Sequence, residues 1–308
     1  MCETMSTGRI VAGCLAPHPP HLVYATNPEQ NEPRSSGAGA WQGLLDGYVN
    51  LRKSLESKDY DVLVVHTPHW RTVVGHHVLA CPSFNGYSVD PVFPNLFRYR
   101  YDLRVDVELA EAIAKEGADA GLVTSAMRNP DFRVDYGTLT CCHLVRPEWD
   151  LPIVAISSNR AYTYFSSEYG DREMLTLGEA TRKAIEATGR RALVLGSCSL
   201  SHRHFTEEPE DPEDPTFERI YNRNQSLWDE RVLEHMRRGD CATLLAEMPD
   251  FIDQAVSECV EGSLTWLLGA LGIPDWPDTV HGYGTVIGTG NAVVEWSPKP
   301  ELAKEEMA

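Results

Sequence analysis

Residues 10–21 read IVAGCLAPHPPH, and residues 60–70 read YDVLVVHTPHW. Each stretch starts as a run of mostly apolar residues and ends in two histidines. Short apolar runs of this kind are typical of buried strands. The two stretches therefore predict strands that carry imidazole groups at their carboxyl ends.

Further apolar runs alternate along the chain with segments whose apolar residues have helical spacing. The expected strands are 10–15, 60–66, 73–80, 122–125, 153–157 and 192–197, and the expected helices are 105–116, 174–188, 226–236, 241–247 and 252–271. This alternation predicts an α/β fold whose central mixed sheet is flanked by helices on both faces. We expect one domain over residues 1–308, with a disordered tail at 1–8 and a flexible tail at 299–308.

Composition narrows the classes of partner. The formal net charge of −18 argues against nucleic acid or an anionic membrane as the main partner, because both require clusters of Lys and Arg. The sequence contains no run of about 18 apolar residues, so no transmembrane helix is expected. The N-terminus does not read as a signal peptide. The eight cysteines include no CxxC pair, so we expect reduced thiols and a cytoplasmic protein.

Three segments are expected to be turns or loops. Residues 27–39 are turn-rich, and residues 207–215 combine acidic residues with prolines, which suits a loop or lid near a site entrance. Residues 281–291 read HGYGTVIGTGN. They are interpreted as a turn and a tight strand, since no Gly-Lys-Ser/Thr ending supports a phosphate-binding loop.

Three pairs of histidines follow three of the expected strands. They are His18 and His21, His66 and His69, and His202 and His204. Ligands of open α/β sheets bind beyond the carboxyl ends of the strands. A single histidine is more often structural, but three pairs at three strand ends predict one shared site.

Imidazole nitrogens suit Fe, Zn, Cu and Ni, and two histidines with one carboxylate leave coordination positions open for substrate and O2. Glu258 and Glu261 are candidates for the carboxylate because they lie in an apolar stretch, 251–271. A glutamate buried there is unfavourable unless it is paired or bound to a metal. The two lie about one helical turn apart, so periodicity does not choose between them.

The motifs that carry chemistry also carry a resemblance. They are GCLAPHPPHLVY at 13–24, NEPRS at 31–35, DVLVVHTPHW at 61–70, VDPVFPNLFRY at 89–99, NPDFRVDYGT at 129–138, LSHRHF at 200–205, GSLTW at 262–266 and HGYGTVIGTGNAVVEW at 281–296. Through them the chain resembles the class III extradiol ring-cleaving dioxygenases, the superfamily of protocatechuate 4,5-dioxygenase. Within that superfamily it is most similar to the catalytic subunits that open aminophenols.

The resemblance implies a role for each matching residue. It implies that His18, His69 and Glu258 bind Fe(II), with O2 as co-substrate, and that His202 is the catalytic acid–base residue. His21, His66 and His204 are then expected to be structural or to orient the metal ligands.

One position departs from the commoner pattern of the superfamily. Many catechol-cleaving members have Asp-His-Gly at the active site, whereas this chain has Asp135-Tyr136-Gly137, as the aminophenol enzymes do. A phenol can hydrogen-bond substrate or oxygen, but it does not become a cation as imidazole does. Tyr136 is therefore expected to contact substrate. The alternative is a packed Tyr136 whose hydroxyl bonds the backbone.

The implied reaction is opening of the ring of 2-aminophenol, or of a substituted aminophenol, to a 2-aminomuconate semialdehyde that can close to picolinate. Alternatives keep the site but change the substrate to catechol or protocatechuate, or make the chain a zinc-dependent or non-catalytic member of the fold. A substrate carboxylate could bind an arginine, for which the candidates are Arg71, Arg98, Arg100 and Arg133. The expected assembly is a homo-oligomer or a heteromer with a related alpha-type subunit.

Overall fold

The structure is a computed structural model that describes residues 8–26, 41–91, 94, 97–159, 167–203 and 219–298. Several expectations fall outside these ranges: the loops at 27–39 and 207–215, His204, and the tails at 1–7 and 299–308. Gly8, which was included in the first tail, is described and buried.

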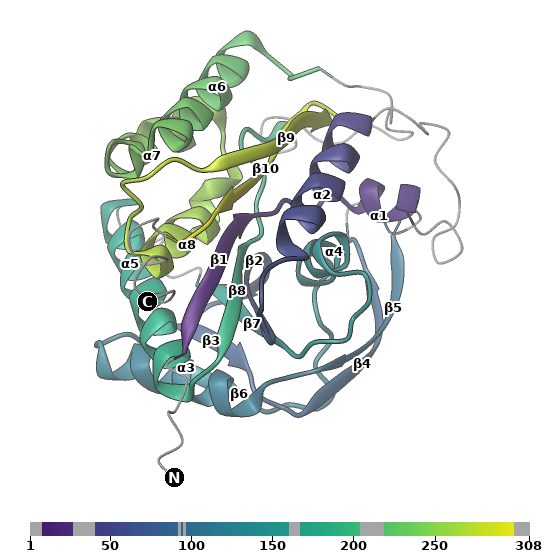
Figure 1. Ribbon diagram of the computed structural model, residues 1–308, viewed down its shortest axis with the longest axis vertical. Helices are drawn as coiled ribbons and strands as arrows, with labels where there is room; N and C mark the ends of the chain where they lie inside the picture. The colour runs from purple at the N-terminus through teal and green to yellow at the C-terminus, as the bar shows by residue number, and fades with distance from the viewer. Residues whose placement is uncertain are drawn as a thin grey trace.

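Eight strands form the central sheet (Figure 1). They are β1 (Arg9–Leu15), β2 (Val62–Thr72), β3 (His76–Leu79), β6 (Thr124–Met127), β7 (Ile153–Asn159), β8 (Arg191–Gly196), β9 (Thr279–Val286) and β10 (Thr289–Trp296). Their order across the sheet is β6-β3-β7-β2-β8-β1-β10-β9. Strands β7, β2, β8 and β1 run parallel to one another, whereas β3 and β10 pair antiparallel with β7 and β1. The predicted mixed sheet is confirmed, and the carboxyl ends of its parallel strands share one edge.

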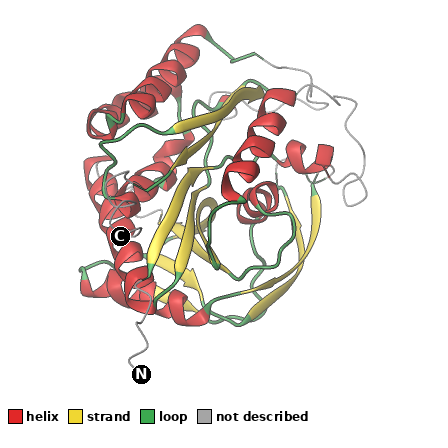
Figure 2. Ribbon diagram, in the orientation of Figure 1, coloured by secondary structure: helices red, strands yellow, loops and turns green. Residues whose placement is uncertain are grey.

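Helices cover both faces of this sheet, as predicted (Figures 1 and 2). One face carries α3 (Val107–Asp119), α5 (Ser167–Thr188) and α8 (Ser263–Leu271), and the other carries α2 (Gln42–Leu55) and α4 (Tyr136–Val145). The remaining α-helices are α1 (Pro20–Thr26), α6 (Arg223–Arg238) and α7 (Cys241–Ala255). Among the helices of the described ranges, none combines the length and apolar character that crossing a membrane requires.

Strands β4 (Ser83–Val89) and β5 (Arg98–Arg104) form a separate antiparallel pair that was not expected. The β5 sequence RYRYDLR alternates between exposed and buried positions. Its buried positions are Tyr99, Tyr101 and Leu103. Because two of these three residues are tyrosines with polar neighbours, the segment does not read as an apolar run.

The expected helix at 252–271 is wrong. The chain leaves α7 at Val256, which has a positive φ of 50°, and Ser257 caps the short 3-10 helix η3 (Glu258–Glu261). Gly262, at φ 85°, then separates η3 from α8. An α-helix cannot pass through residues in the left-handed region, so the two glutamates lie in a tight turn between helices.

The glycine-rich stretch at 281–291 lies in the hairpin formed by β9 and β10. Ile287 and Gly288 occupy its turn, and both have positive φ, as hairpin turns of the mirror-image types require. The interpretation as a turn and a tight strand is therefore confirmed. Strand β10 pairs with β1, so the hairpin extends the central sheet.

Candidate metal centre

Three side chains converge beyond the carboxyl ends of the parallel strands. His18 follows β1, His69 lies in the last part of β2, and Glu258 begins η3. The Nε2 atoms of His18 and His69 are 2.7 Å apart, and the Glu258 Oε1 atom is 3.5 Å from the first and 3.6 Å from the second. Within the ranges that the structure describes, this is the group of His, Cys, Asp and Glu side chains whose arrangement could hold a metal ion.

Neighbouring hydroxyls orient the two histidines. The His18 Nδ1 atom lies 2.9 Å from the Ser197 hydroxyl, which follows β8. The His69 backbone N–H donates to the Thr67 hydroxyl at 3.2 Å, where the pairing of β2 with β7 becomes irregular. Thr67 in turn donates to Asp135 at 2.8 Å. Ser197 therefore holds the His18 ring with Nε2 toward the shared point, and Thr67 fixes the backbone from which the His69 side chain extends.

Glu258 is held by its other carboxylate oxygen. The backbone N–H and the hydroxyl of Ser199 donate to Oε2 at 2.7 and 2.9 Å, so Oε1 faces the histidines. The side chain is 2% exposed. Burial alone would raise the pKa of the Glu258 carboxyl, but His18 and then His69 hold it well below its usual range. The carboxyl is therefore ionised at neutral pH.

This donor set fits a divalent transition metal. Burial, and then the charge of His18, lower the pKa of His69, so its ring is neutral at working pH and can offer a lone pair. Two imidazoles and one carboxylate on one side of an ion match the facial arrangement of non-haem Fe(II) enzymes, which leaves positions open. Because three electron-rich atoms face one another in a buried place, a cation there would stabilise the arrangement.

Tyr136 lies at the same point, at the start of α4. Its hydroxyl is 2.9 Å from the His69 Nε2 atom, and the two ring centroids are 4.2 Å apart. Burial, and then the carboxylates of Asp90 and Glu258, raise the pKa of Tyr136 well above its usual value, so the phenol keeps its proton. The Tyr136 hydroxyl therefore contacts a ring of the cluster. That Tyr136 contacts substrate stays a prediction.

His202 lies beside this cluster and is not part of it. It follows β8, it is half-buried, and its positive charge would be among the influences that lower the pKa of Glu258. The structure thus separates His202 from the three converging side chains.

The remaining histidines have other surroundings. His66 is fully buried, bonds the Ser263 hydroxyl at 2.8 Å and stacks on Trp266. Burial, and then His76, lower the pKa of His66 to about 3, so it is neutral. His21 is also buried and packs against Trp41. Neither histidine belongs to the cluster.

The four candidate arginines divide into two groups. Arg71 forms an ion pair with Glu261 at 2.5 Å, and Ser158 donates to the other oxygen of Glu261 at 3.1 Å. Glu261 therefore binds Arg71 while Glu258 faces the histidines, a division that spacing did not predict. The other three candidates are exposed: Arg98, Arg100 and Arg133.

Sequence reasoning missed the serines that hold the site. Ser197 and Ser199 follow β8 directly and bond His18 and Glu258. The available signal was the segment GSCSLS at 196–201, where small hydroxyl residues follow an apolar strand. Such residues are common in loops, so the signal was weak.

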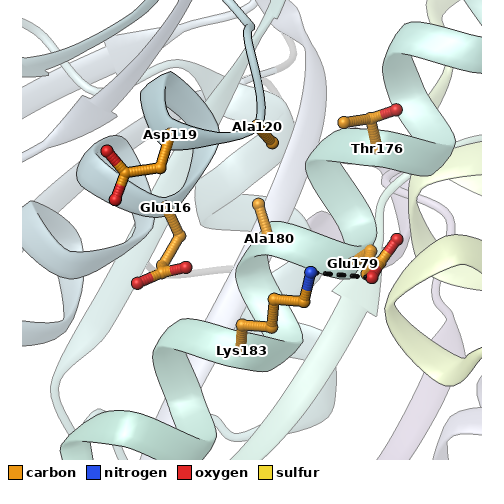
Figure 3. Close-up of a pocket in the computed structure, with 7 residues that line it drawn as sticks. All are labelled: Glu116, Asp119, Ala120, Thr176, Glu179, Ala180 and Lys183. Atoms are coloured by element: carbon orange, nitrogen blue, oxygen red, sulfur yellow. Dashed lines mark ion pairs between the residues drawn. The ribbon is translucent and has the colours of Figure 1, made fainter.

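A surface pocket between α3 and α5 is a different feature (Figure 3). Its charged lining residues are Glu116, Asp119, Glu179 and Lys183, and Lys183 is paired with Glu179 at 2.8 Å. The pocket shares no residue with the cluster.

An α/β fold with a cluster of two histidines and one glutamate at the carboxyl ends of its strands suits a metal-dependent enzyme. Residues 12–295 match the family described as the catalytic LigB subunit of aromatic ring-opening dioxygenase. The chain is 51% identical to the 2-aminophenol 1,6-dioxygenase beta subunit of Pseudomonas sp. over 293 residues, which is 95% of each chain. The chain belongs to this LigB family of ring-opening dioxygenases.

Two further comparisons bear on assembly and fold. The chain is 26% identical to the 2-aminophenol 1,6-dioxygenase alpha subunit of Pseudomonas sp., over 84% of this chain and 92% of that one. It also superposes on the crystal structure of the uncharacterized Escherichia coli K12 protein JW3007 with a TM-score of 0.57, at 14% identity, over 92% of this chain and 99% of that one. The second likeness concerns the fold alone.

Proposed function

We propose that this chain is an Fe(II)-dependent extradiol dioxygenase that opens the ring of 2-aminophenol or a substituted aminophenol. Both atoms of O2 enter the product, a 2-aminomuconate semialdehyde that is a precursor of picolinate. The observation that carries the proposal is the convergence of His18, His69 and Glu258, whose ligand atoms lie within 4.8 Å of one another. The 51% identity to a 2-aminophenol 1,6-dioxygenase beta subunit supports the substrate.

In this proposal His18, His69 and Glu258 hold the iron. When bound, ferrous iron supplies open coordination positions and the redox chemistry that the reaction of O2 with an aromatic ring requires. The residues supply the rest: two imidazoles and one buried carboxylate fix the metal on one side, and Ser197 and Ser199 keep His18 and Glu258 in place.

In this proposal His202 transfers protons and Tyr136 donates a hydrogen bond. His202 would accept the proton that the substrate hydroxyl loses on binding and return it later in the reaction, since the pKa of an imidazole lies near working pH. Tyr136 would donate a hydrogen bond to the substrate. The His69 Nε2 lone pair cannot serve both a metal and the phenol, so metal binding would leave the Tyr136 hydroxyl available to substrate.

The ion pair between Arg71 and Glu261 favours a substrate whose ring carries no carboxylate. Arg71 lies close enough to Tyr136 for its charge to lower the pKa of that phenol. Its guanidinium is engaged by Glu261 and by the Pro68 carbonyl, which accepts from Nε at 3.0 Å. A substrate carboxylate would have to compete with these partners, so protocatechuate is expected to react poorly.

The assembly proposed with this function is a homo-oligomer or a heteromer with an alpha-type subunit. Relatives named as beta and alpha subunits of one enzyme support the heteromer. A cytoplasmic location is also proposed, since the described cysteines are buried free thiols, which suit a reducing compartment.

The test is oxygen uptake by protein loaded anaerobically with Fe(II), with 2-aminophenol, catechol and protocatechuate in parallel. Iron-dependent uptake with 2-aminophenol and formation of a semialdehyde are expected. Uptake with catechol alone would show that the proposed substrate is wrong and that catechol is the better assignment. Because zinc is redox-inert, zinc-loaded protein is the control and should consume no O2.

A further inference from the structure

The segment that carries His202 is bound to its surroundings on both sides of that residue. The Leu200 N–H donates to the Gly290 carbonyl at 2.8 Å, and the Gly290 N–H donates to the Ser201 carbonyl at 3.0 Å. After His202, the Arg203 N–H donates to the Thr289 hydroxyl at 3.2 Å. Strand β10 therefore fixes the backbone on either side of the histidine.

A second attachment comes from a carboxylate on α6, which packs beside β9 and β10 (Figure 1). The Asp229 Oδ1 atom accepts from the Ser201 N–H at 2.9 Å. Its Oδ2 atom accepts from the Ser201 hydroxyl and from the Tyr283 hydroxyl, both at 2.8 Å. Asp229 thus binds the residue before His202 through two groups, and Tyr283 orients the carboxylate.

The close approach of this carboxylate requires a glycine at position 290. A Cβ atom there would lie 2.0 Å from the Asp229 Oδ2 atom and 2.8 Å from the Ser201 hydroxyl. Gly290 also makes the two backbone bonds to the His202 segment. The packing of α6 on β10 is therefore matched to this contact.

The same segment is tied to the proposed metal ligand. The Glu258 N–H donates to the Leu200 carbonyl at 3.2 Å, and the Ser257 hydroxyl donates to the same carbonyl at 2.8 Å. Segment 199–203 is thus held between η3 on one side and Asp229 on the other. The contacts that fix its path also fix where His202 lies relative to Glu258.

A carboxylate is an unfavourable residue for a purely structural role here. Asp229 is fully buried, and burial raises its pKa to about 6, although the bonds from Tyr283 and Ser201 oppose this rise. Burying an ionised group costs free energy that an apolar residue of similar size would not. Asp229 instead accepts three hydrogen bonds, two from Ser201 and one from Tyr283, which hold the backbone and side chain of Ser201 in one place.

From these contacts we propose that Asp229 is a positioning residue for His202, acting through Ser201 and oriented by Tyr283. The hydrogen bonds of Asp229 go to Ser201 and Tyr283, and the Asp229 carboxylate is not part of the His18–His69–Glu258 cluster. The proposal rests on the proposed function, in which His202 transfers protons. It predicts that loss of Asp229 disturbs proton transfer while the three metal ligands stay in place.

The test is a double-mutant cycle with Asp229→Asn and His202→Ala, measured on the Fe(II)-loaded chain. Asp229→Asn alone should lower kcat by roughly 10- to 100-fold with little change in KM, because a small misplacement of a catalytic group has effects of this size. In the His202→Ala background the same change should have no further effect. The cycle uses the residual turnover of His202→Ala. Additive effects, or full activity of Asp229→Asn beside a strongly impaired His202→Ala, would overturn the proposal.

A readout on the metal-free protein separates positioning from activity. Hydrogen exchange of segment 199–203 should be faster in metal-free Asp229→Asn than in the metal-free wild type. In a separate measurement after loading with Fe(II), iron retention should be unchanged. Unchanged exchange would contradict the proposal. Glu295→Gln is the matched control, since this buried carboxylate on β10 accepts from His281 and should keep full turnover when changed. If His202→Ala itself keeps full turnover, the proposed role of His202 fails, whatever the exchange shows of Asp229.

Discussion

At the scale of single residues, serine hydroxyls hold two members of the His18–His69–Glu258 cluster, since Ser197 bonds His18 and Ser199 bonds Glu258. The histidine pairs at strand ends predicted a shared site, and the structure brings His18 and His69 together. Spacing alone could not separate Glu258 from Glu261, because the choice depends on partners distant in sequence. Ser199 directs the first glutamate at the histidines, and Arg71 binds the second.

Ser199→Ala should weaken metal binding. The change removes the hydroxyl that donates to Glu258 Oε2 and leaves the backbone donor, so the carboxylate gains freedom. Loss of such a supporting bond typically lowers metal affinity by roughly 10- to 100-fold. An Fe(II) titration measures the effect. Ser158→Ala, which removes a bond to Glu261 instead, is the control, and equal losses in both variants would contradict the role of Ser199.

Tyr136→Phe should keep the metal and reduce turnover. The ring packing is preserved, but the hydrogen bond to substrate is lost, which corresponds to about 1–3 kcal/mol, or roughly 5- to 150-fold in kcat/KM. Because the raised pKa of Tyr136 keeps the phenol protonated, the alkaline side of the pH–rate profile should be the same in both proteins. A profile whose alkaline limb disappears in the variant would show that the tyrosine ionises during turnover.

At the scale of elements, the sequence predicted the strands and helices that have a continuous apolar run or one apolar face. It did not predict the elements that have neither pattern. The parallel strands were identified because they are continuous apolar runs. Helix α4 was missed because all ten of its residues are buried, so YGTLTCCHLV has no helical periodicity. The break between α7 and α8 was missed because the positive φ of Val256 is set by tertiary packing, and valine seldom adopts it.

Gly137→Ala tests how tightly α4 packs on the site. An added Cβ would lie 2.8 Å from His69 Cδ2 and 2.9 Å from the Thr67 hydroxyl, so the ring or the helix must move. The variant should lose about 1–3 kcal/mol of stability and bind Fe(II) at least 10-fold more weakly. Chemical denaturation and metal titration provide the measurements. Gly43→Ala in α2, where the nearest atom is at 3.4 Å, should show neither effect.

At the scale of the whole molecule, alternating strands and helices predicted the architecture but not the order of the strands. Sheet order β6-β3-β7-β2-β8-β1-β10-β9 depends on which strands pair across long stretches of chain, and no local pattern encodes that. The net charge of −18 likewise says nothing about the arrangement of His18, His69 and Glu258. Buried pairs far from the site still affect the stability of the fold.

The pair of Glu295 and His281 should make the free energy of unfolding depend on pH. Burial would raise the pKa of Glu295, but His281, Ser54 and Lys58 lower it from 4.5 to about 2. The ionised carboxylate therefore stabilises the fold above about pH 4.5, and this stabilisation is lost as the pH falls toward 2. Glu295→Gln should lower the free energy of unfolding by roughly 1–3 kcal/mol at pH 7. The difference from the wild type should shrink between pH 4.5 and 2, and a constant difference would contradict this assignment.

The most direct test of the central claim, that His18, His69 and Glu258 form the metal centre, is iron content after anaerobic loading and desalting. The wild type and His202→Ala should each retain about one Fe(II) per chain, and His18→Ala, His69→Ala and Glu258→Ala should retain little. Retention of iron by His69→Ala together with its loss from His202→Ala would contradict the assignment of the metal ligands.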